Sequence, residues 1–543
     1  MALGGRSLLL CSAFLLAAGV AGPLRPFLEA ALTNHEPQRI LVLGGDADRE
    51  RVGLNLARRM NLPLVVSGGT NPEYAQWLMQ DAGLEPDRVR LDYRAQDTLG
   101  NFTSLVDELD REGALPDGKT LQQQIPGQIV RDGRTVYECV AGFQNVEFRK
   151  PASSDTIYRM YSMTKPIVSV AIMMLFEMGK LHISDPAYLY LGEKWKKRNM
   201  RVYVQNSYDT KTKHYETRAC ERTITIKHLL THTSGITYGF DVNGLSNKVD
   251  KIFHDKLRSR KTNLKEFVEN LLPTVPLMFQ PGKHWWYGFN TDVLGRIVEV
   301  VSGTDLETFL RRFIFKPLGM TKTSFTIQHD PSHFASCYMR KGQEIGMLAM
   351  GKSKGNDRGL RNLDKLLNEK EHMCNPLNDP NAPNFFQSGG SGLCGTVEDY
   401  IRFCECIRNG GGIDGVRILS RKTVQFMLSN HLGPYDMRDM QRDVPIEGAY
   451  TEMGEPGTGF GLGFSVTMDE TRSSYVVSNG SVGWGGAAST VFWIDPKEKL
   501  SVVFATQLRF RDDLKLPIRA LLSNLIYASV IDGDAYHGRR SRM

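Results

Sequence analysis

The sequence predicts an α+β protein, an antiparallel sheet with helices, preceded by a small Rossmann-like α/β segment. The chain has 543 residues, which is too long for one ordinary core. Residues 38–112 alternate strand-like and helix-like runs, as a parallel sheet with crossover helices does. From about residue 121 to 527, strand-like runs stand at both ends and helical runs lie between them. One sheet assembled from the two ends of this region is therefore expected.

The first residues predict an export signal. Residues 7–21 are apolar, Arg6 precedes them, and small residues stand at Gly19 and Ala21. This pattern is typical of a secretory signal peptide or a short N-terminal membrane anchor, and a buried first helix is the competing interpretation. We therefore predict residues 1–22 to be a signal peptide or anchor. The protein is then secreted or membrane-anchored, and any membrane association is made through the N-terminus.

Residues 23–115 predict a partial Rossmann-like domain. Strand-like runs lie near 40–43, 64–66 and 89–91, with helical segments between them. Double glycines follow the first two runs, and they favour either tight turns or close approach of a phosphate. They do not form G-x-G-x-x-G, so they are only weak support for a dinucleotide site.

This segment resembles the first half of the SanA-like bacterial envelope proteins. The resemblance ends before that family's second half, because no further strand with its histidine and arginine follows. The matching stretches are Val42–Gly45, Val66–Gly69 and Thr98 with Asn101.

A linker at Leu115–Gly118 leads into the main domain, which we predict to span residues 116–535. Ile129–Val130 and Val136–Tyr137 flank a turn and predict a hairpin. Residues 536–543 contain three arginines and predict a basic tail. Further strands are predicted at 459–466, 474–477, 489–494 and 499–505, and helices at 162–180, 264–272, 291–302, 305–314 and 396–409.

Composition excludes several classes of function. The net charge is only +7 and no basic stripe is interleaved with aromatic residues, so nucleic-acid binding is not expected. The eight cysteines form no C-x-x-C pair, which argues against a zinc site or a disulfide framework. His228 and His232, like His329 and His333, are four residues apart but lack the Glu of H-E-x-x-H. No metal and no cofactor is implied.

The stretch Ser162-Met163-Thr164-Lys165 carries the first chemical signal. At helical spacing, residues three apart share a face, so the hydroxyl of Ser162 and the amine of Lys165 can meet. A serine needs a neighbour to take its proton, and a partly buried lysine can do that or can steer a second base. A helix cap and a solvated lysine are the simpler alternative. The nearly continuous apolar run from Ile167 to Phe176 argues against it, because it places Lys165 at the mouth of a buried helix.

Two further stretches complete a candidate site. Tyr287 lies in Trp285-Trp286-Tyr287, and a tyrosine facing Lys165 would have a stabilised phenolate that can act as a base. In Trp484-Gly485-Gly486-Ala487 the glycines allow close backbone approach, and a following N–H can serve an oxyanion hole. Taken singly, the tyrosine reads as core packing and the glycine pair as a turn or bulge.

Together these stretches resemble the class C β-lactamase-related serine hydrolases, in particular the family VIII carboxylesterases and their acyltransferase relatives. The order and spacing of the motifs agree over most of the region after residue 121. The resemblance implies a β-lactamase/penicillin-binding-protein-like transpeptidase fold. The other stretches that carry it are Leu229–Gly235, Asp292–Gly295, Pro317–Met320, Ser388–Leu393 and Phe492–Pro496.

The resemblance implies roles for the site residues. Ser162 would be the nucleophile, Lys165 would keep Tyr287 or Ser162 deprotonated, and Tyr287 would act as base and then acid. The backbone N–H groups of Ser162 and Ala487 would form the oxyanion hole. Trp484, Gly485, Gly486 and Asn290 would line the substrate site.

Two departures from the β-lactamases bear on the substrate. Those enzymes usually have Tyr-x-Asn, whereas here Phe289 is two residues after Tyr287 and Asn290 follows it. They also usually have Lys-Thr-Gly where this chain has Trp484-Gly485-Gly486. A tryptophan cannot replace the charge that would bind a substrate carboxylate. The site therefore favours neutral esters with apolar acyl groups.

The sequence thus predicts a serine hydrolase that cleaves small carboxylic esters through an acyl-enzyme. The alternatives are acyl transfer to an alcohol or amine, weak β-lactamase or D-peptidase activity, and a catalytically silent binding or scaffolding relative.

Overall fold

The computed structural model divides into two compact units, residues 1–122 with 512–543, and residues 123–511. Each unit has its own sheet. The predicted signal segment, residues 1–22, and the predicted tail, 536–543, lie outside the described residues. The structure describes residues 40–43, 64–67, 89–92, 127–209, 211–239, 247–257, 262–327, 331–340, 360–364, 376, 379–441, 455–509 and 518–530.

The first unit contains three parallel strands, in the order β1-β2-β3. They are β1 (Ile40–Leu43), β2 (Leu64–Ser67) and β3 (Val89–Asp92). Ile40 pairs with Leu64, and Leu64 pairs with Val89. The three predicted strands and their parallel order are confirmed, while the predicted helices between them lie outside the described residues. The resemblance to SanA-like proteins stays a prediction. Helix α17 (Ile518–Ala528) also belongs to this unit.

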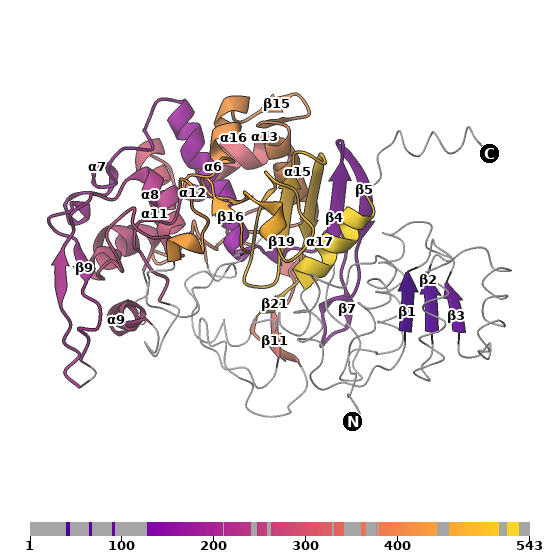
Figure 1. Cartoon of the computed structure of the whole chain (residues 1–543), viewed down its shortest axis with the longest axis horizontal. Helices are drawn as coiled ribbons and strands as arrows, with labels where there is room; N and C mark the ends of the chain where they lie inside the picture. The colour runs from indigo at the N-terminus through magenta and orange to yellow at the C-terminus, as the bar shows by residue number, and fades with distance from the viewer. Residues whose placement is uncertain are drawn as a thin grey trace. The chain divides into compact units, whose positions relative to one another are not determined.

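The second unit is built on a seven-stranded antiparallel sheet in the order β16-β17-β18-β19-β20-β4-β5. In Figure 1 the purple β4–β5 hairpin stands beside the gold strands from the other end of this unit. The register places Val502 of β20 opposite Ile129 of β4. A sheet joining the two ends of the region is therefore confirmed. Its strands are β16 (Thr458–Phe460), β17 (Ser465–Thr467), β18 (Val482–Gly485), β19 (Val491–Asp495), β20 (Leu500–Phe504), β4 (Gly127–Arg131) and β5 (Arg134–Cys139).

Two predicted strands are corrected. The run 459–466 is not one strand, because the chain reverses after β16 and returns as β17. The Gly461 N–H donates to the Phe464 carbonyl at 2.8 Å, and Gly463 has φ +95°, a conformation that favours glycine. The run 474–477 is not a strand at all. Its Ser474 hydroxyl donates instead to the carboxylate of Glu455, 19 residues earlier in the chain.

Helix α6 (Thr164–Glu177) is the central helix of this unit. It is buried all round through Leu175, as an apolar helix in the middle of a core should be. It begins two residues later than predicted, because Tyr161–Met163 form a 3-10 turn. Helix α11 (Asn290–Ser302) packs against α6, and α15 (Val397–Arg408) packs against strands β4, β19 and β20 of the sheet.

The remaining predicted helices are also present. Residues 264–272 form α10 (Leu264–Glu266) and a π-helical turn, and 305–314 form α12 (Leu306–Leu310) and a second such turn. The other described helices are α7 (Tyr188–Leu191), α8 (Ile226–Leu230), α9 (Lys248–Leu257), α13 (Lys316–Leu318) and α16 (Arg421–Met427). The short strands are β6 (Phe143–Asn145), β7 (Lys150–Pro151), β8 (Tyr158–Arg159), β9 (Arg201–Tyr203), β10 (Thr217–Ala219), β11 (Tyr338–Arg340), β12 (Leu360–Asn362), β13 (Cys394–Gly395), β14 (Gly412–Ile413), β15 (Val416–Arg417) and β21 (Leu508–Arg509).

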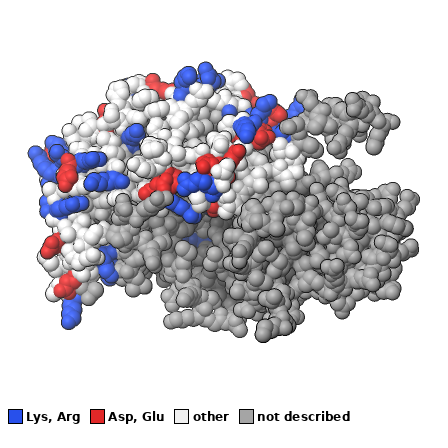
Figure 2. All heavy atoms as spheres, viewed as in Figure 1, with Lys and Arg blue, Asp and Glu red and all other residues white. Residues whose placement is uncertain are grey.

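The described surface mixes both signs of charge. On the face shown in Figure 2, Lys and Arg side chains gather near α7 and β9, with acidic side chains among them. There Glu193 forms ion pairs with both Lys196 and Arg198. Among the described residues, no helix has the length and apolar character needed to span a bilayer.

Candidate active site

The structure brings Ser162 and Lys165 together. Ser162 lies in the 3-10 turn before α6, and Lys165 lies in the first turn of α6. Lys165 Nζ donates to Ser162 Oγ at 3.2 Å and to the Gly390 carbonyl at 2.7 Å. Both side chains are buried, Ser162 at 6% exposure and Lys165 at 2%. A lysine this buried acts on its neighbours with little screening by water.

Tyr287 and Trp484 join the same group. Lys165 Nζ lies 4.6 Å from the centroid of the Tyr287 ring. The Trp484 indole Nε1 donates to the Tyr287 hydroxyl at 3.1 Å. A nearby cation and an N–H donor both stabilise a phenolate relative to the neutral phenol. The three stretches that the sequence singled out therefore meet in one place, although the predicted contact between Trp484 and substrate stays a prediction.

The turn after β18 lies against the backbone that leads into Ser162. A Cβ atom added at Gly486 would lie 2.5 Å from the carbonyl oxygen of Met160, so only glycine allows this approach. Thr490 Oγ1 also contacts that carbonyl, at 3.4 Å. Gly485 ends β18, and Ala487 directly follows Gly486. Ala487 is thus the residue after the one that contacts the backbone before Ser162, and its role as an oxyanion-hole donor stays a prediction.

Asn290 makes hydrogen bonds within the protein. It is fully buried at the start of α11, where its amide nitrogen lies 2.9 Å from His232 Nδ1 and its oxygen accepts from Ser234 Oγ at 2.5 Å. The His232 ring lies 5.0 Å from the Tyr287 ring, between centroids. Burial, together with the charge of Lys165, holds the pKa of His232 well below its usual range, so this imidazole is neutral. The contact of Asn290 with substrate stays a prediction.

Sequence reasoning missed two residues that support Lys165. Asp292, fully buried in the first turn of α11, accepts from Ser388 Oγ at 2.5 Å and from the Gly390 N–H at 3.2 Å. Gly390 in turn offers its carbonyl to Lys165. Both lie in stretches that carried the family resemblance. A carboxylate directly before the apolar pair Val293–Leu294 was the available signal, since such a group needs a partner when buried.

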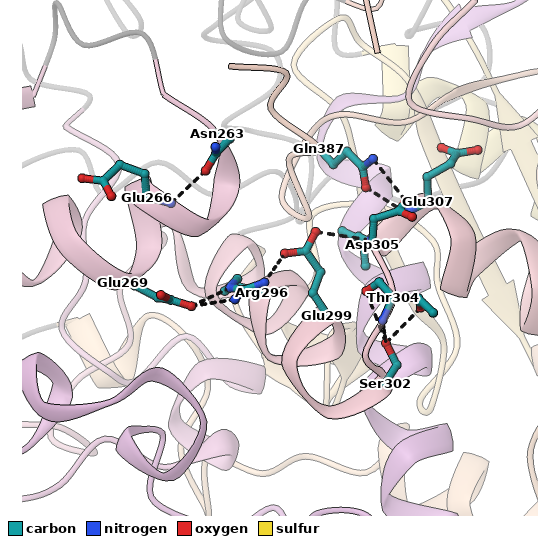
Figure 3. Close-up of polar contacts among 11 residues, drawn as sticks. Asn263, Glu266, Glu269, Arg296, Glu299, Ser302, Thr304, Asp305, Glu307 and Gln387 are labelled. Carbon is teal, nitrogen blue, oxygen red and sulfur yellow. Dashed lines mark hydrogen bonds and ion pairs between the residues drawn. The ribbon is translucent and has the colours of Figure 1, made fainter. Parts of the chain in front are cut away.

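Figure 3 shows how α11 and the Gln387–Gly390 loop are anchored. Arg296 of α11 pairs with Glu269 at 2.7 Å and with Glu299 at 2.8 Å. Gln387 accepts from the Glu307 N–H at 2.8 Å and donates to Asp305 at 3.3 Å, at the start of α12. Gln387 therefore ties the loop that leads to Gly390 to the start of α12.

His228 and His232 have structural partners, while His329 lies outside the described residues. His228 Nδ1 accepts from the Thr225 N–H and closes a capping box at the start of α8. Among the described residues, no group of three or more His, Cys, Asp or Glu side chains could hold a metal ion.

Comparison with known proteins places this arrangement in context. A family model described as Beta-lactamase matches residues 102–524. Esterase EstB of Burkholderia gladioli is 26% identical over 460 residues, which cover 83% of this chain and 100% of EstB. Acyltransferase calJ of Penicillium decumbens is 25% identical over 433 residues, covering 78% of this chain and 92% of calJ. The solved structure of EstCE1, a hydrolase with promiscuous acyltransferase activity, superimposes with a TM-score of 0.58 at 23% identity, covering 80% of this chain and 99% of EstCE1.

Proposed function

Because the chain belongs to the beta-lactamase family, we propose that it is a serine hydrolase that cleaves carboxylic esters through an acyl-enzyme formed on Ser162. The observation that carries the proposal is the 3.2 Å contact between Lys165 Nζ and Ser162 Oγ, with the Tyr287 ring beside the same ammonium. Nucleophile and proton-handling groups within hydrogen-bond reach are the signature of covalent catalysis. The similarity to esterase EstB supports the same reading.

The proposed reaction has two halves. Ser162 Oγ attacks the ester carbonyl carbon, and its proton passes to the pair formed by Tyr287 and Lys165. The carbonyl oxygen takes up negative charge beside the backbone N–H groups of Ser162 and Ala487. Collapse expels the alcohol, which takes the proton back. Water then attacks the acyl-enzyme by the same route and releases the acid.

The substrate class follows from Trp484. Its indole N–H is engaged by the Tyr287 hydroxyl, and the residue is 1% exposed, so this position offers no cation to a substrate carboxylate. Neutral esters with apolar acyl groups suit it better than β-lactams or peptide C-termini, which are anionic. Acyl transfer is the second candidate, supported by the similarity to acyltransferase calJ. Weak β-lactamase or D-peptidase activity and a silent binding relative are the remaining alternatives.

One experiment tests the proposal against these alternatives. Purified protein treated with a fluorophosphonate should gain one adduct by intact mass, mapped to the peptide that carries Ser162. A burst of p-nitrophenol from p-nitrophenyl butyrate should accompany it. Neither adduct nor release would favour the silent relative. Nitrocefin turnover as fast as ester turnover would contradict the preference for esters, and an added alcohol that diverts most of the acyl group would favour acyl transfer.

The oxyanion hole can be tested at Gly486. We expect Gly486→Ala to lower kcat/KM for p-nitrophenyl butyrate by about 10²-fold, as loss of one oxyanion donor typically does. The new Cβ would lie 2.2 Å from Thr490 Oγ1 and 2.5 Å from the Met160 carbonyl, so the turn must move away from Ser162. Gly127→Ala is the matched control, because its Cβ makes only ordinary contacts, at 3.6 Å. A wild-type value of kcat/KM in Gly486→Ala would contradict a role for this turn in the oxyanion hole.

A further inference from the structure

Two residues beside the proposed oxyanion hole have a left-handed backbone conformation, which residues other than glycine rarely adopt. Tyr161, directly before Ser162, has φ +46°, and Ser489, two residues after Ala487, has φ +64°. For a residue with a side chain this region is costly, and it persists only where the surrounding structure holds it. The backbone on both sides of the proposed hole is therefore set by contacts from outside the local sequence.

One small apolar cluster holds the Tyr161 side chain. Its buried members are Cys337, Met339, Leu363 and Ala488, and Tyr161 packs against them. Met339 lies in β11, and Leu363 directly follows β12. These two strands belong with β21 to a three-stranded sheet that is separate from the seven-stranded one. This group, which we call the Tyr161 cluster, therefore ties the residue before the proposed nucleophile to a second sheet.

The third strand of that sheet contacts the same tyrosine. Arg509 of β21 lies with its guanidinium carbon 5.2 Å from the centroid of the Tyr161 ring. The neighbouring Leu508 donates its N–H to the Ala488 carbonyl at 3.2 Å, and Thr506 Oγ1 donates to the same carbonyl at 2.7 Å. Tyr161 and Ala488 are therefore held by one strand as well as by one cluster.

The Tyr161 cluster joins the two segments that carry the proposed oxyanion donors. Ser162 directly follows Tyr161, and Ala487 directly precedes Ala488. An oxyanion hole is effective because its donors are fixed in place before the negative charge develops. Each proposed donor is the sequence neighbour of a cluster member, so the cluster restrains both stretches of backbone at once.

We propose that Tyr161 is a positioning residue whose ring, packed in the Tyr161 cluster and against Arg509, aligns the backbone N–H groups of Ser162 and Ala487 for the oxyanion. The inference rests on the proposed function and deepens it, since it names the side chain that sets the hole and not a group that forms it. The ring acts on the transition state and not on ester binding, because the full negative charge develops only there.

Tyr161→Ala tests this in the full-length chain. Without the ring, the backbone at residue 161 can relax to an ordinary conformation and move the Ser162 N–H. We expect kcat for p-nitrophenyl butyrate to fall about 10–10²-fold with KM little changed, since a misplacement of about 1 Å can cost 10²-fold. Inhibition by butylboronic acid, whose tetrahedral adduct on Ser162 presents an oxygen to the hole, should weaken by the same factor. Tyr161→Phe keeps the ring and should recover most of both losses.

Tyr203→Ala is the matched control for the loss of a tyrosine ring. Tyr203 is buried in β9, in the two-stranded sheet of β9 and β10. Its replacement should lower the melting temperature and leave kcat and inhibition by butylboronic acid unchanged. If Tyr161→Ala does not fold, Leu363→Ala, which loosens the same cluster from the side of β12, is measured instead. It should lower kcat and weaken boronate inhibition together.

The outcomes separate this inference from the proposed function. A Tyr161→Ala enzyme with wild-type kcat and wild-type boronate inhibition overturns the role of Tyr161 and leaves the serine hydrolase standing. A fall in kcat without weaker boronate inhibition also overturns it, because the loss would then lie outside the oxyanion hole. Equal losses in Tyr203→Ala contradict it as well, since they would report general loss of structure. Wild-type protein without a fluorophosphonate adduct at Ser162 overturns the proposed function and this inference with it.

Discussion

Replacing Ser162 with alanine should lower kcat/KM for p-nitrophenyl butyrate by about 10⁴-fold or more, since removal of a catalytic nucleophile has effects of this size and larger. Without Oγ no acyl-enzyme can form, and the remaining site offers only electrostatic stabilisation to water attack. The fluorophosphonate adduct should disappear completely. The measurements are initial rates over a range of ester concentrations and intact mass after labelling.

Ser162→Ala should leave the fold intact, so the loss of ester turnover can be attributed to the missing nucleophile. Lys165 keeps its bond to the Gly390 carbonyl, so its ammonium still has a partner. Ser169→Ala is a suitable control: Ser169 is a buried serine further along α6 that lies against Gly463. It should keep wild-type labelling. Retained ester turnover in Ser162→Ala, at an unchanged melting temperature, would show that another residue is the nucleophile.

Tyr287→Phe should lower kcat by about 10²–10⁴-fold, the range that general acid–base catalysis contributes. The variant keeps the ring, which packs 5.0 Å from His232 and 5.5 Å from Trp484 between centroids, so KM should change little. The indole N–H of Trp484 loses its acceptor, and a buried unsatisfied donor costs about 1–3 kcal/mol of stability. Steady-state kinetics and a thermal melt measure the two effects separately.

Trp484→Phe provides the matching comparison. If the indole acts through the Tyr287 hydroxyl, the double variant Tyr287→Phe/Trp484→Phe should be no slower than Tyr287→Phe alone, because the two losses share one interaction. Fully additive losses would mean that Trp484 acts on the substrate independently, as the sequence predicted. If kcat of Tyr287→Phe stays within about threefold of the wild-type value, the phenol does not act as a general acid or base, because the loss would be well below what acid–base catalysis contributes.

Local signals predicted the secondary structure well where the pattern was strong. The hairpin of β4 and β5 followed from two apolar pairs around a glycine turn, and α6 followed from its apolar run. The errors came where side chains or backbone have partners distant in sequence. Gly463 turns the chain where its backbone meets Ser169. In the run 474–477, the Ser474 hydroxyl donates to Glu455, and no strand forms. Neither contact is visible as a periodic pattern.

The pairing of Ser162 with Lys165 follows from the sequence alone, because groups three residues apart at a helix start must lie on one face. The contact between Trp484 and Tyr287 joins residues 197 positions apart, and that between Lys165 and Gly390 spans 225. Such contacts depend on how α6, α11 and the edge of β18 pack, which is set by the shape of the whole core and not by any local spacing. The folded chain therefore adds what the motifs leave open: a phenol that accepts from an indole N–H, and a lysine held by the carbonyl of Gly390.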